Sequence, residues 1–349
     1  MKKAQIIQVF AGLLIAAAGL YIFFRDVKIE ELWKQIASTS IWEILGVALL
    51  NPVMLWIRAL RWKIILPSSQ NTHKRGLFGL VMIGFMANNI LPARLGEAAR
   101  AVLLWKRNGF TVVESAGSLI LERFIDSLVF SSFFFLPVFL KSSLSVLFPY
   151  AVLMACGFFA VVTCFFIYSI RPEFSRGILI MILRRMPLKI RTGVHKFGRQ
   201  LISNLDWVFS FRKVVLVIFY SFLTLMCQVL MMILLGMRIE GFGVLEGMFG
   251  TASAAFGAAI PLSPGYVGTL HAALLSGLSL LGVTSDNAGA IAVLYHAICY
   301  VTVTALGLIC LFSIRISFKE IGKAKENLKD HQESRRVIWD RKKQEQTTL

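Results

Sequence analysis

One stretch, residues 84–126, restricts the possible fold of this chain more than any other. It begins as an apolar run, is interrupted by polar residues and a proline at 88–92, and later carries Glu122, Arg123 and Asp126 within another apolar run. Lipid hydrocarbon accepts neither an interrupted helix nor an unpaired charge unless protein or a water-filled cavity surrounds it. We therefore expect this stretch to line a site inside a membrane domain.

A second interrupted apolar stretch, residues 256–274, repeats the pattern of the first. Pro92 is followed four residues later by Gly96, and Pro264 is followed four residues later by Gly268. The spacing is a weak signal alone, but interruptions at corresponding places in two halves of a membrane protein are typical of sites between inverted repeats. We expect two broken hairpins of this kind.

Composition supports a membrane protein and restricts its partners. The chain has 349 residues, of which 57% are hydrophobic, and its mean hydropathy is +0.71, which indicates an all-α polytopic membrane protein. Its formal net charge is +18. Because the lysines and arginines fall between apolar runs, we attribute them to membrane orientation and anionic lipid head groups, and expect no nucleic-acid partner.

The placement of basic residues predicts a topology of six full spans and two re-entrant hairpins. The expected spans are 4–24, 41–62, 111–140, 147–170, 214–236 and 287–314, and the expected hairpins are about 76–100 and 247–281. Positive charge flanks both ends of the first break, which favours a hairpin that enters and leaves on one face. The two hairpins then enter from opposite faces, as an inverted repeat.

The same rule places both termini in the cytoplasm, as expected for a multi-pass protein of the plasma (inner) membrane. Residues 1–314 form the predicted membrane domain, and residues 171–213 form a basic amphipathic loop within it on the cytoplasmic surface. Residues 315–349 are predicted to be a charged, helical cytoplasmic tail.

Three acidic and basic residues within an expected span form the first candidate site. Glu122 and Asp126 are four residues apart and share a helix face, with Arg123 as their nearest cation in the sequence. They form either an internal ion pair that locks two helices or a cavity-facing triad that binds a charged head group or carries protons. Both interpretations stay open.

Further arginines give a second candidate site. Arg94, Glu97 and Arg100 recur every three residues at a helix start, where free N–H groups favour phosphate, and we prefer a phosphate site over arginines that reach to the interface. Arg58 and Arg61 either snorkel at the inner interface or bind a head group. We expect His271 and His296 to be packing residues, and the sequence has no nucleotide-binding loop, nucleophile elbow or metal-ligand cluster, so we expect no cofactor or metal.

Four runs carry a family resemblance: RALRW, NNILPARLGEAARA, LERFID and PLSPGYVGT. They resemble the membrane region of the lysylphosphatidylglycerol synthase family, also called the flippase-like integral-membrane family, over about residues 4–314. Larger relatives add an aminoacyl transferase or glycosyltransferase domain, and this sequence contains neither, so the resemblance implies lipid movement rather than synthesis. It implies functional roles for Arg94, Gly96, Glu97, Arg100, Glu122, Arg123, Asp126, Pro264, Gly265 and Gly268.

The sequence therefore predicts a lipid flippase or head-group transporter that moves an anionic phospholipid or a polyprenyl-phosphate lipid across the inner membrane. A separate lipid-modifying synthase is a possible partner. The alternative is a membrane-embedded enzyme that modifies lipids, such as a polyprenyl-phosphate glycosyltransferase or a subunit of one. We favour the transporter, because the catalytic carboxylates available are few and no donor-binding domain is visible.

Overall fold

A computed structural model describes residues 3–25, 27–67, 76–91, 95–170, 206–260 and 263–314. All regular secondary structure in these residues is helical, which confirms the predicted all-α polytopic membrane protein. Most of the predicted amphipathic loop (residues 171–205) and the whole predicted tail (315–349) lie outside the described residues, so those two predictions stay untested.

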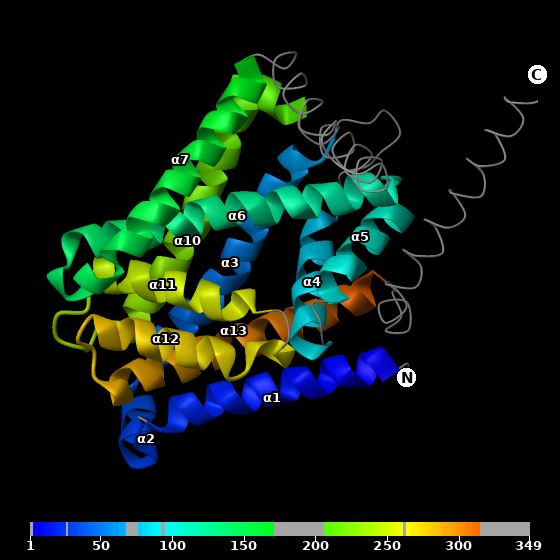
Figure 1. Cartoon of the computed structure of the whole chain (residues 1–349). Coiled ribbons are helices and arrows are strands. Elements are labelled where there is room, and N and C mark those ends of the chain that lie inside the picture. The colour runs from blue at the N-terminus through cyan, green and yellow to red at the C-terminus, as the bar shows by residue number, and fades with distance from the viewer. Residues whose placement is uncertain are drawn as a thin grey trace, which may run out of the picture.

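Long helices form the frame of the molecule (Figure 1). They are α1 (Lys3–Arg25), α3 (Ile41–Ile65), α6 (Val112–Leu140), α7 (Phe148–Ile170), α10 (Phe211–Gly236) and α13 (Ser285–Ser313). Four of them, α3, α6, α10 and α13, contain segments long and apolar enough to cross a membrane. Helices α1 and α7 have 23 residues each, which is also a spanning length. These six helices coincide with the six expected spans.

Shorter helices connect or pair with the long ones. They are α2 (Ile29–Ser38), α4 (Leu77–Ile90), α5 (Leu95–Asn108), η2 (Ser142–Leu147), η3 (Asp206–Phe209), α11 (Val244–Ala259), η4 (Pro264–Tyr266) and α12 (Thr269–Leu280). Capping residues fix the N-terminal ends of two of the long helices. Ser40 and Glu43 form a capping box before α3, and Thr111 and Glu114 form one before α6.

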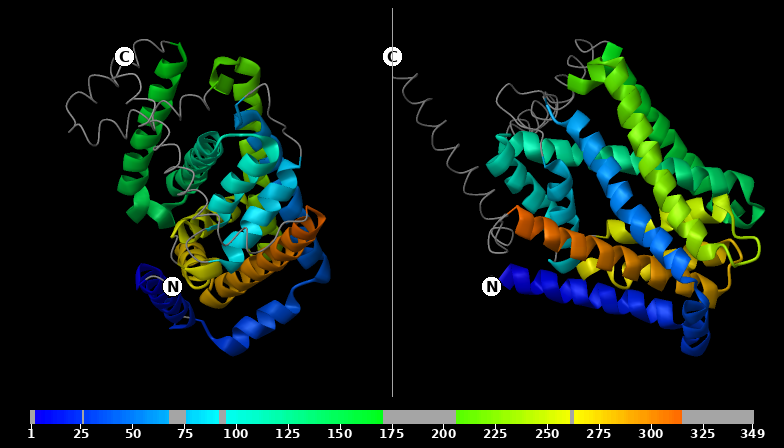
Figure 2. Two further views of the ribbon diagram at one scale, coloured as in Figure 1. Left: turned by 90° about the vertical axis from the view of Figure 1, so that its right-hand side faces the viewer. Right: turned by 180° about the vertical axis from the view of Figure 1, so that it is seen from behind.

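The two interrupted stretches form two helical hairpins. Helices α4 and α5 lie side by side, as do α11 and α12 (Figures 1 and 2). The end of α4 meets η4 of the second hairpin inside the molecule, since a Cβ atom added to Gly265 would lie 3.0 Å from the carbonyl oxygen of Asn89. Each hairpin is therefore a helix pair, and the two pairs touch where α4 ends and η4 begins.

Polar contacts gather several helix ends at one end of the molecule. The backbone N–H of Lys28 donates to Oδ1 of Asp286 at 3.0 Å, which joins the end of α1 to the start of α13. Arg238 Nε lies 2.6 Å from Glu43 Oε1, which joins the end of α10 to the start of α3. A similar pair, Lys141 and Glu246 at 2.8 Å, joins the end of α6 to the start of α11. In each contact the end of one helix meets the start of another. Helices that cross a membrane in alternating directions are expected to meet in this way.

Small residues allow the hairpins to pack closely. A Cβ on Gly96 would lie 1.9 Å from the carbonyl oxygen of Gly84, so α4 and α5 touch backbone to backbone. A Cβ on Gly268 would lie 2.2 Å from the carbonyl oxygen of Ala16, which brings α1 onto the start of α12. In lipid, where burial of apolar surface gives helices little reason to associate, such close approach is a main source of packing energy.

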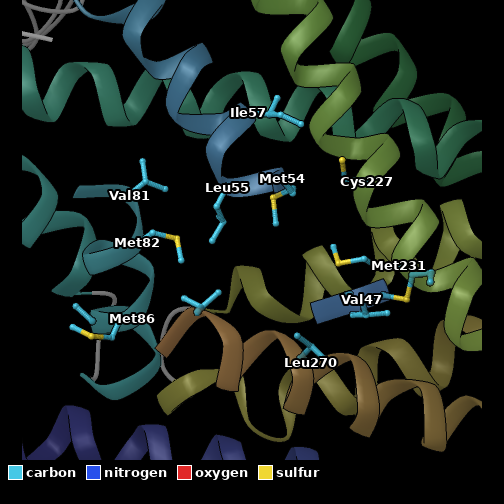
Figure 3. Close-up of a cluster of buried hydrophobic side chains, with 14 of the residues drawn as sticks. Val47, Met54, Leu55, Ile57, Val81, Met82, Met86, Cys227, Met231 and Leu270 are labelled. Atoms are coloured by element: carbon cyan, nitrogen blue, oxygen red, sulfur yellow. The ribbon is translucent and has the colours of Figure 1, made fainter. Parts of the chain in front are cut away.

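The largest core cluster lies between α3, α4, α10, α12 and α13 (Figure 3). Methionines and aliphatic residues fill it, with Val47, Leu55, Met82, Met86 and Met231 all nearly inaccessible. Flexible thioether side chains fit the irregular spaces between helices that cross at different angles. The core fixes α3 against the hairpins and so sets the position of the arginines on α3.

Candidate functional site

A cluster of charged side chains lies within the bundle where α3, α5 and α6 meet. Its members are Arg58 and Arg61 from α3, Glu97 and Arg100 from α5, and Glu122, Arg123 and Asp126 from α6. All but Glu97 and Arg123 are buried. Because the basic pair on α3 is three residues apart and the acidic pair on α6 is four apart, each pair faces the other helix from a single face of its own. We call these seven residues the charge cluster.

Glu122 is the most enclosed member of the charge cluster, with no exposed surface. Arg100 donates to it through two nitrogens, with Nη2 2.9 Å from Oε2 and Nη1 3.4 Å from Oε1. Arg58 Nη1 lies 3.4 Å from Oε1 on the other side. Two-pronged contact with a guanidinium is the strongest geometry for a carboxylate pair.

Asp126 is shared by two arginines of α3. Its Oδ1 lies 2.6 Å from Arg61 Nη2, and its Oδ2 lies 3.0 Å from Arg58 Nη1. Arg61 also donates from Nη1 to the hydroxyl of Ser221 in α10 at 2.9 Å. The pair therefore ties α3, α6 and α10 together.

Arg123 and Glu97 form the exposed edge of the charge cluster. Their side chains are 35% and 31% exposed, and Arg123 Nε lies 3.4 Å from Glu97 Oε1. Arg123 also approaches Glu122 at 3.6 Å and Asp126 at 3.5 Å, whereas the shortest contact of each inner arginine is 2.6 to 3.0 Å. The cluster thus runs from a sealed interior to an accessible edge.

Aromatic rings cover the arginines where carboxylates do not. The guanidinium of Arg100 lies 4.1 Å from the ring centre of Trp62. Those of Arg58 and Arg123 lie 5.3 and 5.9 Å from the ring centre of Phe85 in α4. A cation–π contact stabilises a desolvated cation by about 2 kcal/mol.

Several sequence interpretations need correction. Arg58 and Arg61 do not snorkel, because both are at least 96% buried and bound to carboxylates. Arg123 is not the main cation of the acidic pair, since Arg61 and Arg100 are closer to it. Arg100 is not left open for phosphate, because Glu122 already binds it.

The remaining predicted positions differ in their placement. Arg94 lies outside the described residues, so its expected phosphate contact stays a prediction. Gly96 serves close packing, and its N–H donates to Oδ1 of Asn88 at 2.9 Å. Pro264 begins η4, and Gly265 and Gly268 adopt positive φ angles of 58° and 82° that favour glycine. These residues shape the hairpin turns.

The second hairpin contains a residue with an unusual backbone, Tyr266, which sequence reasoning missed. Tyr266 has a φ of 63°, the one positive value among the non-glycine residues that the structure describes. A bulky residue held in the left-handed region is strained, and such strain is concentrated at functional sites. Gly265 and Gly268 in the sequence indicated an unusual backbone here, but they did not indicate that Tyr266 itself has a positive φ.

Helix α13 binds both hairpins with a polar stripe at four-residue spacing. His296 Nε2 lies 2.8 Å from the carbonyl oxygen of Gly265 in the second turn. Four residues along the same face, the Tyr300 hydroxyl donates at 3.5 Å to the carbonyl oxygen of Asn89, at the end of α4 in the first hairpin. A further step along, Thr304 Oγ1 accepts from Asn89 Nδ2 at 3.1 Å. We call His296, Tyr300 and Thr304 the α13 stripe.

The two histidines hold each other in a defined hydrogen-bond direction. The N–H of Gly268 donates to His271 Nδ1 at 3.3 Å, so the proton of a neutral His271 is on Nε2, 3.3 Å from His296 Nδ1. The proton of His296 is then on Nε2, where it donates to Gly265. The prediction that both histidines pack and hydrogen-bond within the core is confirmed.

These features define a class: an all-helical, polytopic membrane protein whose two hairpins meet beside a buried cluster of arginines and carboxylates. The chain belongs to the family described as the lysylphosphatidylglycerol synthase TM region, which matches residues 9–307. A curated relative, the UPF0104 membrane protein MJ1078 of Methanocaldococcus jannaschii, is 23% identical over 247 residues, which are 65% of this chain and 93% of the relative. The family resemblance noted in the sequence is confirmed.

Proposed function

We propose that this protein moves a lipid with an anionic head group across the plasma (inner) membrane. The observation that carries the proposal is the charge cluster, in which four arginines face three carboxylates inside a membrane domain. An uncompensated cation is costly in a low-dielectric interior, so an incoming anion is favoured there. The lipid tails would stay in the bilayer while the head group passes the hairpin turns.

The engagement of the carboxylates favours transport over lipid modification. A general base needs a lone pair directed at its substrate. Both oxygens of Glu122 accept hydrogen bonds from arginines. Oδ1 of Asp126 accepts from Arg61, and its Oδ2 accepts no hydrogen bond but lies 3.0 Å from the Arg58 guanidinium. The structure therefore supports a charge-compensating role for these groups more than an acid–base role.

The finer topology belongs to the same proposal. We place the gathered helix ends at the outer face, both termini in the cytoplasm, and the two hairpins as opposed re-entrant pairs of an inverted repeat. Exposed Trp33 and Trp42 at this end, 69% and 77% accessible, support a membrane–water interface there, because tryptophan concentrates at that level. The meeting of the two hairpins where α4 ends and η4 begins supports their entry from opposite faces.

The test is a leaflet-accessibility assay with purified protein in vesicles of phosphatidylcholine that contain chain-labelled phosphatidylglycerol. Dithionite added outside bleaches the label in the outer leaflet, and bleaching beyond that fraction reports movement. We expect protein-dependent movement that Arg123→Gln abolishes. The control is Lys34→Gln, which changes an exposed cation whose partner Glu31 is also exposed, and it should retain movement.

Two results would reject the proposal. The first is an absence of protein-dependent movement for every lipid class tested, including polyprenyl-phosphate lipids. The second is full movement by Arg123→Gln, which would show that lipid passes elsewhere.

A further inference from the structure

The charges of the cluster do not balance. Arg58, Arg61, Arg100 and Arg123 contribute four positive charges, whereas Glu97, Glu122 and Asp126 contribute three negative ones. The count concerns the described members of the cluster and leaves a surplus of one positive charge. In addition, the Nε atoms of the three buried arginines have no hydrogen-bond partner. A ligand that neutralises this site adds one negative charge.

Among the four arginines, Arg123 is the one at which a ligand can reach the surplus positive charge. Arg58, Arg61 and Arg100 are at most 4% exposed by their side chains, whereas Arg123 is 35% exposed. The shortest contact of Arg123 is 3.4 Å, compared with 2.6 to 3.0 Å for the inner arginines. Arg123 is therefore the arginine that can change its partner without opening the buried part of the cluster.

Glu97 occupies the position of an anionic ligand on Arg123. Its carboxylate is half-buried, and its Oε1 lies 3.4 Å from Nε of the guanidinium at the accessible edge. A phosphate diester presents the same arrangement of two unesterified oxygens with a single shared charge, and arginine binds both groups in the same way. Phe85 lies beneath Arg123 and limits the direction from which a ligand approaches.

We infer that the site takes a phosphodiester head group with one negative charge, which replaces the Glu97 carboxylate on Arg123, and that Glu97 sets the preference for one charge over two. The inference rests on the proposed transport function and narrows its substrate class. A diester makes the occupied site neutral. A phosphomonoester, which is doubly ionised above about pH 6 to 7, leaves an unpaired negative charge beside Glu122 and Asp126.

The experiment compares three labelled lipids in the same vesicles at alkaline pH: phosphatidylglycerol (a monoanionic diester), phosphatidic acid (a dianionic monoester) and phosphatidylcholine (neutral overall). For the unmodified protein we expect phosphatidylglycerol to move about tenfold faster than phosphatidic acid, a difference of about 1.4 kcal/mol. A competition arm with glycerophosphoglycerol, which lacks acyl chains, distinguishes the head group alone from the lipid. A second arm with a sugar-linked polyprenyl phosphodiester distinguishes isoprenoid from diacyl lipids.

Glu97→Gln changes the charge surplus from one to two and is the decisive variant. We expect it to reverse or remove the preference, so that phosphatidic acid gains about tenfold relative to phosphatidylglycerol. Glu97→Asp keeps the charge and is the matched control, which should retain the preference. If Glu97→Gln does not fold, a rate for phosphatidic acid that equals or exceeds that for phosphatidylglycerol in the unmodified protein still overturns the inference.

The outcomes separate the inference from the function on which it rests. Movement of all three lipids at equal rates, or faster movement of phosphatidic acid by the unmodified protein, overturns the inference and leaves transport standing. An equal loss for all lipids in Glu97→Gln also overturns it, because a merely structural role predicts that result. Movement of no lipid overturns both.

Discussion

Removal of the Asp126 charge should destabilise the protein more than removal of any single arginine from the charge cluster. Asp126→Asn keeps the shape of the side chain but takes an anion from Arg61 and Arg58, which lie 2.6 and 3.0 Å away and are almost fully buried. The surplus in the cluster then rises from one positive charge to two. By contrast, Arg61→Met brings the same count to zero.

The size of the effect follows from burial. Removal of one partner from a buried ion pair typically costs about 3 to 5 kcal/mol, because the other partner stays desolvated and unpaired. At about 1.4 kcal/mol per factor of ten, Asp126→Asn lowers the ratio of folded to unfolded protein by about two to four orders of magnitude. Arg61→Met in the Asp126→Asn background returns the surplus from two positive charges to one, as in the unmodified protein, and should recover most of the loss.

Glu43→Gln is a closely matched control. Glu43 and Asp126 have the same side-chain exposure of 8%, and each lies 2.6 Å from an arginine, but the partner of Glu43 is the 54% exposed Arg238. Because water can solvate that arginine, Glu43→Gln should cost about 1 kcal/mol or less.

The assay is reversible unfolding in mixed micelles of increasing SDS content, followed by circular dichroism. The reasoning is refuted if Asp126→Asn costs no more than Glu43→Gln. It is also refuted if Arg61→Met makes Asp126→Asn worse, because that result would mean that shape rather than charge governs the cluster.

Three further predictions concern packing, the hairpin turns and topology. Gly96→Ala should prevent normal assembly, since its Cβ would lie 1.9 Å from a backbone oxygen, whereas Gly157→Ala, with nothing within 4 Å, should leave the yield of folded protein unchanged. Tyr300→Phe removes a 3.5 Å bond from the α13 stripe to the first hairpin and should raise amide hydrogen exchange around residue 89 without loss of folding. A cysteine at Ser142 should react with an impermeant thiol reagent from outside and one at Lys106 only from inside; the opposite result would reject the proposed orientation.

The hairpins were predictable because their signal is local. Proline and glycine interrupt apolar runs at 92–96 and 264–268, and a broken helix at that depth requires cover by protein whatever its partners are. The same reasoning identified the six long helices to within a few residues at most of their ends. It could not show that the two hairpins meet, because that contact joins residues 89 and 265 from opposite halves of the chain.

The candidate site was predicted in its members but not in its pairing. Glu122 and Asp126 stood out because charge within an apolar run is rare. Arg58 and Arg61 were noted as basic residues at the inner interface. Each pair has the spacing that places both of its members on one helix face, three residues on α3 and four on α6. Nothing in the sequence, however, selects α3 over another helix as the partner of α6. Ser221 carries no unusual local signal, so its bond to Arg61 becomes visible only in three dimensions.

The contact between α1 and the second hairpin has a consequence for biosynthesis. Gly19 lies against the backbone of Gly268, and the N–H of Lys28 bonds to a carboxylate 258 positions later in the chain. The first helix to leave the ribosome therefore reaches these partners among the last segments to be made. Until then it must reside in the bilayer without them, open to competing helices or to an insertion chaperone. Chains that stop before residue 263 should expose the glycine face of α1 and be removed by membrane quality control.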